Sequence, residues 1–163
     1  MSKTTKKLVL IDGNAIIHRA FHALPPLTTK KGELVNAVYG FSNLILKVIK
    51  DLAPDYIIVA FDLKGPTFRH QEYQEYKATR VKAPQELYDQ IGRVKEVVRA
   101  MNIPIYEKEG FEADDIIGTI AKQAEKYKDI ETIIVTGDLD TLQLVDDKTK
   151  VYALRKGMSD TVI

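Results

Sequence analysis

The sequence contains no cysteine, so disulfide bonds and thiolate metal sites are excluded. It also lacks any apolar run that approaches the ~20 residues needed to span a bilayer. The polar, basic start of the chain is followed only by the short apolar run 8–11, which cannot form the apolar part of a secretory signal. Internal repeats and low-complexity linkers are absent too. These absences favour a cytoplasmic protein with no membrane partner.

What is present is the composition of an ordinary globular protein, with 45% hydrophobic and 29% charged residues in a chain of 163. That length predicts one domain with its own core. The net charge of +1 conceals an asymmetry. Residues 64–82 hold five basic and two acidic residues, a net of +3, whereas residues 107–147 hold twelve acidic and four basic residues, a net of −8. Charge alone fits two solvated faces, and it also suits a polyanion together with the cations that let it approach.

Short apolar runs alternate with helical periodicities along the chain. The apolar runs predict strands at residues 8–11, 56–61, 103–106, 132–136 and 150–154. The helical periodicities predict helices at residues 37–52, 84–101 and 113–127. This alternation indicates an α/β fold with a mostly parallel central sheet and helices on both faces.

Two segments do not follow this alternation. Residues 24–33 contain two prolines and a glycine and predict a loop. Residues 63–83 are polar and basic, and a connection of this length without apolar periodicity is usually functional or mobile. We therefore expect a basic helical arch or a mobile loop near residues 63–83.

The basic side chains of this second segment could hold a nucleic acid. Lys77 and Arg80 would share one face of any helix formed there and could grip a phosphate, and Arg69 could contact another. Tyr73 and Tyr76 could stack on the bases of an unpaired strand. The alternative for the aromatic residues is that they pack into a small hydrophobic lid.

Four aspartates stand within a few residues after the ends of predicted strands. Asp12 ends the first run, Asp62 follows the second, and Asp138 and Asp140 follow the run 132–136. In an open parallel sheet the carboxyl ends of the strands share one edge, where ligands bind. Any one of these residues could simply be a helix cap or a turn former. Several carboxylates at one edge would repel each other, and a hard cation such as Mg²⁺ would relieve that repulsion.

Three more acids stand at the start of the predicted helix 113–127. Asp114 falls on its apolar stripe, where a carboxylate needs a partner such as a metal ion, and Glu112 could reach the same edge. Asp115 lies on the polar side and is a weaker candidate. All three could instead favour the helix dipole. Seven carboxylates exceed what one Mg²⁺ requires, so the sequence predicts two metal ions acting on a phosphate.

Five motifs carry a resemblance to a known family: LIDGN at residues 10–14, AVYGF at 37–41, FDLKGPTFRHQEYQEYKATR at 61–80, GFEADDIIG at 110–118 and TGDLDTLQL at 136–144. In this order they resemble the 5′-nuclease domain of bacterial DNA polymerase I, which is similar to the flap endonucleases. The resemblance covers nearly the whole chain and implies a PIN-like or resolvase-like 5′-nuclease fold.

The resemblance implies one metal site formed by Asp12, Asp62, Glu112 and Asp114 with Asp115 close by, a second site that includes Asp138 and Asp140, and arch positions at Lys77 and Arg80. It implies Mg²⁺, with Mn²⁺ as a substitute, and removal of 5′ flaps and RNA primers in replication and repair. A polymerase domain in the same full-length chain and a nucleoid-associated bacterial location follow from the same resemblance. Residues 1–163 would form the metal-binding N-terminal part and end before the helix-hairpin-helix region that completes the second site. Weak binding of the second ion and low activity are therefore expected.

Three other functions remain as alternatives. A haloacid dehalogenase-like phosphatase would need an Asp-x-Asp pair after the first strand, and the sequence Asp12-Gly13-Asn14 counts against it. A PIN-type ribonuclease shares the carboxylate edge but usually lacks a long basic, aromatic arch. A non-catalytic module would bind phosphates through Lys77 and Arg80 without turnover.

Overall fold

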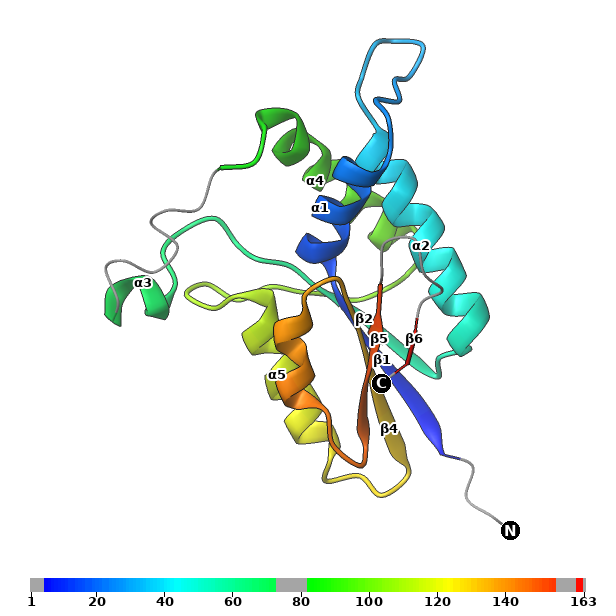
Figure 1. Cartoon of the computed structure of the whole chain (residues 1–163), viewed down its shortest axis with the longest axis vertical. Coiled ribbons are helices and arrows are strands. Elements are labelled where there is room, and N and C mark those ends of the chain that lie inside the picture. Colours follow the sequence, from blue (N-terminus) through cyan, green and yellow to red (C-terminus); the bar gives the residue numbers. More distant parts are fainter. Residues whose placement is uncertain (1–4, 73–81, 155–160, 163) are drawn as a thin grey trace.

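The computed structural model describes residues 5–72, 82–154 and 161–162 (Figure 1). Its centre is a six-stranded sheet with the order β3-β2-β1-β4-β5-β6. The strands are β1 (Lys6–Asp12), β2 (Tyr56–Ala60), β3 (Ile105–Tyr106), β4 (Ile130–Thr136), β5 (Thr149–Ala153) and β6 (Thr161–Val162). The first five pair in parallel, and β6 pairs antiparallel with β5.

The central strand β1 is apolar on both faces, as a parallel strand covered by helices must be. Val9 and Ile11 point into one core, whereas Leu8 and Leu10 point into the other. The register pairs Asp12 with Ala60 of β2. Because the strands run in the same direction, the residues that follow β1, β2 and β4 emerge at one edge of the sheet.

Helices cover both faces of the sheet. The first face carries α1 (Gly13–Ala23), α2 (Asn36–Leu52) and α4 (Gln85–Ala100), and the second carries α5 (Ala113–Ala124) and the 3₁₀ helix η1 (Leu139–Leu144). The short helix α3 (Phe68–Glu72) lies to one side of these layers (Figure 1). No helix within the described residues is both long enough and apolar enough to cross a bilayer.

A buried polar cluster joins three helices of the first face. The side-chain oxygen Oε1 of Gln90 in α4 accepts hydrogen bonds from the backbone N–H groups of Ala37 (2.8 Å) and Val38 (3.3 Å), at the start of α2. Gln90 Nε2 donates to Asn36 Oδ1 (3.0 Å), and Asn36 Nδ2 donates to the carbonyl oxygen of Phe21 in α1 (3.0 Å). Gln90 therefore caps α2 from a neighbouring helix and satisfies N–H groups that the helix cannot pair itself.

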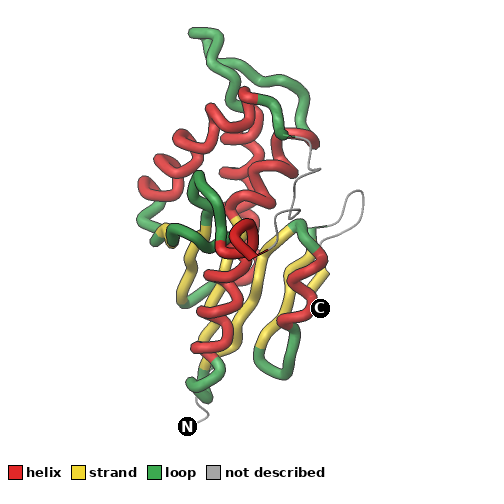
Figure 2. The backbone as a smooth tube through the Cα atoms, turned by 90° about the vertical axis from the view of Figure 1, so that its left-hand side faces the viewer, coloured by secondary structure: helices red, strands yellow, loops and turns green. Residues whose placement is uncertain are grey.

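The predicted fold class is confirmed, and each predicted strand and helix is present with shifted ends. The segment 24–33 is a loop, held by a bridge between Thr28 and Leu34, and it extends beyond the helices at one end of the molecule (Figures 1 and 2). Two helices, α1 and η1, were not predicted from the sequence. Helix α1 follows β1 without a linker and has a short apolar stripe, and η1 is too short for a clear period.

Candidate metal centre at the carboxyl edge of the sheet

Asp12 lies at the end of β1 and is only 4% exposed. Its Oδ1 accepts a hydrogen bond from the backbone N–H of Ala15 (3.0 Å), so Asp12 is the N-cap of α1. Its Oδ2 accepts a hydrogen bond from the hydroxyl group of Thr136 at the end of β4 (3.3 Å). One carboxylate oxygen of Asp12 therefore caps α1, as the sequence allowed, while the other contacts the end of the neighbouring strand β4.

Asp12 is held close to other carboxylates. Burial, which disfavours the charged form, raises its pKa to about 7, and repulsion by the carboxylates of Asp114 and Asp62 adds to this rise. The hydrogen bonds from Ala15 and Thr136 lower the same pKa and only partly offset the rise. Carboxylates from β1, from the segment after β2 and from α5 thus influence one another at this edge.

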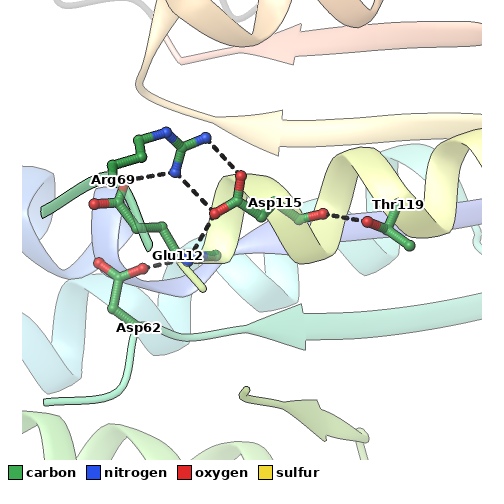
Figure 3. A network of polar contacts seen from close by, with 6 residues as sticks. Asp62, Arg69, Glu112, Asp115 and Thr119 are labelled. Carbon is green, nitrogen blue, oxygen red and sulfur yellow. Dashed lines mark hydrogen bonds and ion pairs between the residues drawn. The ribbon is translucent and has the colours of Figure 1, made fainter. Parts of the chain in front are cut away.

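Asp62 joins the end of β2 to the start of α5. Its Oδ1 accepts a hydrogen bond from the backbone N–H of Ala113 (2.7 Å), and its own N–H donates to Asn14 Oδ1 (3.0 Å). The exposed Asp62 side chain stands beside Glu112 in Figure 3. These contacts fix three segments that are far apart in the sequence against each other.

The close approach of the first residue of α1 to the Phe61 ring, just after β2, depends on a glycine. A Cβ atom at Gly13 would lie 2.3 Å from the Phe61 ring, a separation that real atoms do not tolerate. Phe61 is fully buried and stacks on Phe41 with ring centroids 6.4 Å apart, so it has little room to retreat. Gly13 thus lets the residues that follow Asp12 lie directly on the residue that precedes Asp62.

Arg69 of α3 binds the acids at the start of α5 (Figure 3). Its guanidinium donates to both oxygens of Asp115, at 2.8 and 2.6 Å, and lies 3.6 Å from Glu112 Oε2. Asp115 Oδ2 also accepts the backbone N–H of Glu112 (2.9 Å). Sequence analysis predicted Arg69 as a phosphate contact and Asp115 as the weaker ligand candidate. Here the two residues form a bidentate pair.

Asp138 and Asp140 lie on the exposed side of the same edge. Asp138 Oδ1 accepts the backbone N–H of Asp140 (2.9 Å) and caps η1. The Asp138 N–H donates to Thr136 Oγ1 (3.0 Å), and that hydroxyl in turn donates to Asp12 (3.3 Å). Thr136 therefore connects the two groups of carboxylates. A groove of about 600 Å³ lies between α5 and η1, and both Asp114 and Asp140 line it.

The donor chemistry at this edge fits a hard divalent cation, because its candidate ligands are carboxylate oxygens. Within the described part of the chain, no three acidic or histidine side chains already converge on one point. Mg²⁺ does not require such a cage, since it usually takes one or two carboxylates and keeps several waters. Asp12, Asp62 and Asp114 can supply the one or two carboxylates that Mg²⁺ needs.

Four predicted nucleic-acid contacts, Tyr73, Tyr76, Lys77 and Arg80, lie outside the described residues. Two residues that organise the edge were not predicted from the sequence. Thr136 and Asn14 each hold a candidate ligand, Thr136 through its hydroxyl and Asn14 through its side-chain oxygen. Their positions beside the strand-end aspartates were visible in the sequence, but a threonine or asparagine at a strand end carries no signal specific to a metal site.

Comparison with known proteins identifies relatives of the whole chain. Residues 7–162 match the family described as 5′-3′ exonuclease, N-terminal resolvase-like domain. The chain is 49% identical over 155 residues to DNA polymerase I of Bacillus subtilis (strain 168), which takes in 95% of this chain and 18% of that protein. It is 46% identical over 155 residues to DNA polymerase I of Mycobacterium tuberculosis (strain ATCC 25618 / H37Rv), covering 94% and 17%. The chain thus spans less than a fifth of these relatives.

Solved structures share the fold at low sequence identity. The T5 D15 protein co-crystallised with metal ions superposes with a TM-score of 0.74 at 20% identity, covering 91% of this chain and 55% of that one. The T5 5′-exonuclease with bound zinc gives 0.71 at 18% identity, with the same coverage. These likenesses confirm the predicted 5′-nuclease type of fold.

Proposed function

This chain belongs to the family of 5′-3′ exonuclease N-terminal resolvase-like domains, and we propose that it forms the metal-binding part of a divalent-metal-dependent 5′-3′ exonuclease and flap endonuclease. The resemblance drawn from the five motifs is confirmed by this membership. The proposed reaction is hydrolysis of phosphodiesters near the 5′ end of DNA flaps or RNA primers in replication and repair. We further propose a polymerase domain in the same full-length chain, because the relatives are much longer, and a bacterial cytoplasmic location at the nucleoid.

One observation carries the proposal. Asp12 is a nearly buried carboxylate whose neighbours include two further carboxylates, Asp62 and Asp114. Neighbouring carboxylates make the charged form of the buried Asp12 unfavourable, and a cation bound there would stabilise that charged form. The three residues come from segments about 50 residues apart and meet only in the fold.

We assign the first ion to Asp12, Asp62, Glu112 and Asp114, with Asp115 close by, and the second ion to Asp138 and Asp140. Mg²⁺ is the proposed ion and Mn²⁺ a substitute, because both accept carboxylate oxygen. A pair of such ions would activate a water and stabilise the leaving oxygen of an in-line displacement.

Other residues of the chain would hold the metal ligands and the substrate in position. Asn14 and Ala113 hold Asp62 in place through the hydrogen bonds described above. Arg69 sits beside the carboxylates and can exchange them for a phosphate, with which it can form the same bidentate contact. Lys77, Arg80, Tyr73 and Tyr76 are proposed to hold the strand at the arch.

Substitution of Asp62 by asparagine tests this function, because asparagine can still accept the Ala113 N–H but carries no charge. We expect cleavage of a 5′-flap DNA in Mg²⁺ to fall by more than about 100-fold, because even loss of a residue that only supports a metal ligand costs about 10–100-fold. The matched control is Asp89→Ala, which removes an exposed carboxylate on α4. Its cleavage rate should equal that of the wild type.

The assay should compare 5′-flap, single-stranded and duplex DNA and an RNA primer on DNA, with Mg²⁺ or Mn²⁺, for this chain and for a longer chain. Unchanged turnover by Asp62→Asn, with an unchanged melting temperature, would remove Asp62 from the ligand set. Binding without cleavage by both lengths of chain would favour the non-catalytic alternative.

A further inference from the structure

The groove between α5 and η1 extends well beyond the carboxylate edge. The two helices lie side by side in Figure 1, with α5 in yellow-green and η1 in orange. The groove between them has a volume of about 600 Å³ and is mainly lined by polar and charged side chains. It begins at Asp114 and Asp140 and continues along α5 to its carboxyl end.

One row of α5 lines this groove. Asp114, Gly118 and Lys122 follow each other at intervals of four residues, which places them above one another on α5, and Lys126 lies in the turn just after the helix. All four line the groove, and each interval within the helix corresponds to a rise of about 6 Å, from 1.5 Å per residue. Neighbouring phosphates of an extended strand are separated by a comparable distance.

The charge along this row changes sign. The end near the sheet edge carries Asp114, where a cation is proposed, and the far end carries two lysines. Between them, Gly118 has no side chain, and a Cβ there would only touch Leu144 of η1, at 3.6 Å. The row therefore contributes no side chain of its own between its two ends, and the Leu144 side chain of η1 lines the groove at that point.

The lysines are available for a phosphate. Lys122 pairs with Glu125 at 2.8 Å, but its side chain is 78% exposed, and exposed pairs contribute little and exchange readily. Lys126 is exposed and has no ion pair with any residue in the described part of the chain. Side-chain amides of Gln123 and Gln143 line the same groove and can donate to phosphate or base oxygens.

We propose that the groove between α5 and η1 holds the phosphodiester backbone of a single nucleic-acid strand, with Lys122 and Lys126 contacting successive phosphates that lead away from the cleavage site. This inference rests on the proposed nuclease function and adds to it a path for the strand on the face opposite α1, α2 and α4. Neither lysine touches the scissile bond, so both act in binding and not in chemistry.

Salt-dependent binding tests the proposal. Lys122→Gln, Lys126→Gln and the double variant keep much of each side-chain stem and remove its charge. The probe is a fluorescently labelled single-stranded oligodeoxynucleotide, titrated in Ca²⁺ at several salt concentrations, with an oligoribonucleotide of the same sequence in a second series. Each single variant should lower the slope of log Kd against log salt by about 0.7, and the double variant by about 1.4.

Lys50→Gln is the matched control, because Lys50 occupies the last turn of α2 as Lys122 occupies the last turn of α5, on the opposite face of the sheet. It should leave the slope unchanged. In cleavage assays with a longer, active chain, the double variant should raise KM while kcat stays within about twofold of the wild type, since only binding is affected.

Failure of this inference can be told from failure of the proposed function. If the wild type binds and cleaves, but the double variant keeps its slope and KM, no strand occupies the groove and the nuclease proposal stands. If neither the wild-type chain nor the longer chain binds single strands or cleaves any substrate, both proposals are wrong. A stronger loss with RNA than with DNA would assign the groove to an RNA strand.

Discussion

The two faces of the sheet differ in how tightly they are covered. On the first face, α1, α2 and α4 cover a core of large, almost fully buried side chains, which includes the stacked pair Phe41 and Phe61. On the second face, α5 and η1 cover the sheet with a smaller core rich in alanine and isoleucine, and an open groove separates the two helices. The first face is a rigid support that fixes the strand ends, and the second leaves room for a ligand.

The glycines of the two faces show the same difference. A Cβ on Gly40 of α2 would lie 2.8 Å from the Ala20 side chain and 2.9 Å from that of Leu24, so α1 and α2 are in close contact there. A Cβ on Gly118 of α5 would meet only Leu144, at ordinary contact distance. The same chemical change should therefore have opposite effects on the two faces.

The largest effect is expected at Asp12, where the two faces meet. Its folded-state pKa of about 7 lies above the ordinary value of 3.8, so the folded protein without metal binds an extra proton between about pH 4 and 7. Stability consequently falls as pH rises through this window, and the penalty is complete above pH 7. The difference between the two pKa values corresponds to a loss of up to about 4 kcal/mol in the free energy of unfolding.

Asp12→Asn removes this penalty and can still cap α1. In the presence of a chelator, urea unfolding should show the variant more stable than the wild type at pH 8, by up to about 4 kcal/mol, and nearly equal at pH 4. Adding Mg²⁺ at pH 8 should stabilise the wild type but not the variant. If the stability of the two proteins depended on pH in the same way, the pKa of Asp12 would not be raised by folding.

A second prediction tests the rigidity of the first face. Gln90→Leu preserves the side-chain size but leaves Asn36 Oδ1 and the N–H of Ala37 without their buried partner. We expect a loss of about 3 kcal/mol in the free energy of unfolding, because unpaired buried polar groups each cost roughly 1–3 kcal/mol. Gln85→Leu, on the exposed start of the same helix, is the control. Equal unfolding midpoints for both variants would contradict a stabilising role for the cluster.

The smallest effects come from the paired glycine changes. Gly40→Ala should destabilise the protein by about 1–3 kcal/mol, since the tightly packed α1 cannot move away. Gly118→Ala should stabilise it by roughly 0.5–1 kcal/mol, because alanine favours the helix and the groove accommodates the methyl group. Thermal unfolding of both variants measures the contrast. Destabilisation by both would mean that the second face is as tightly packed as the first.

Much of the arrangement could be predicted from local sequence. The apolar runs at β1, β2 and β4 and the stripes of α2, α4 and α5 have the periods of buried strands and amphipathic helices, which is why their positions were found within a few residues. Helix α1 was not found, because its start at Gly13 reads as a turn and its apolar stripe is short. The bidentate pair of Arg69 with Asp115 joins residues 46 positions apart, and no sequence pattern near either residue predicts it.

The sequence by itself determined which residues could form strands and helices. It also placed aspartates just after the strands that become β1, β2 and β4. Both features depend only on periodicity and on neighbours along the chain. Only the tertiary structure decided how deeply each carboxylate is buried, and which acids are held by Arg69 or Thr136. It also decided that a row of α5 opens into a groove with η1. Burial, repulsion and open space arise between segments that are distant in sequence, so they exist only once the parallel strands bring their ends to one edge.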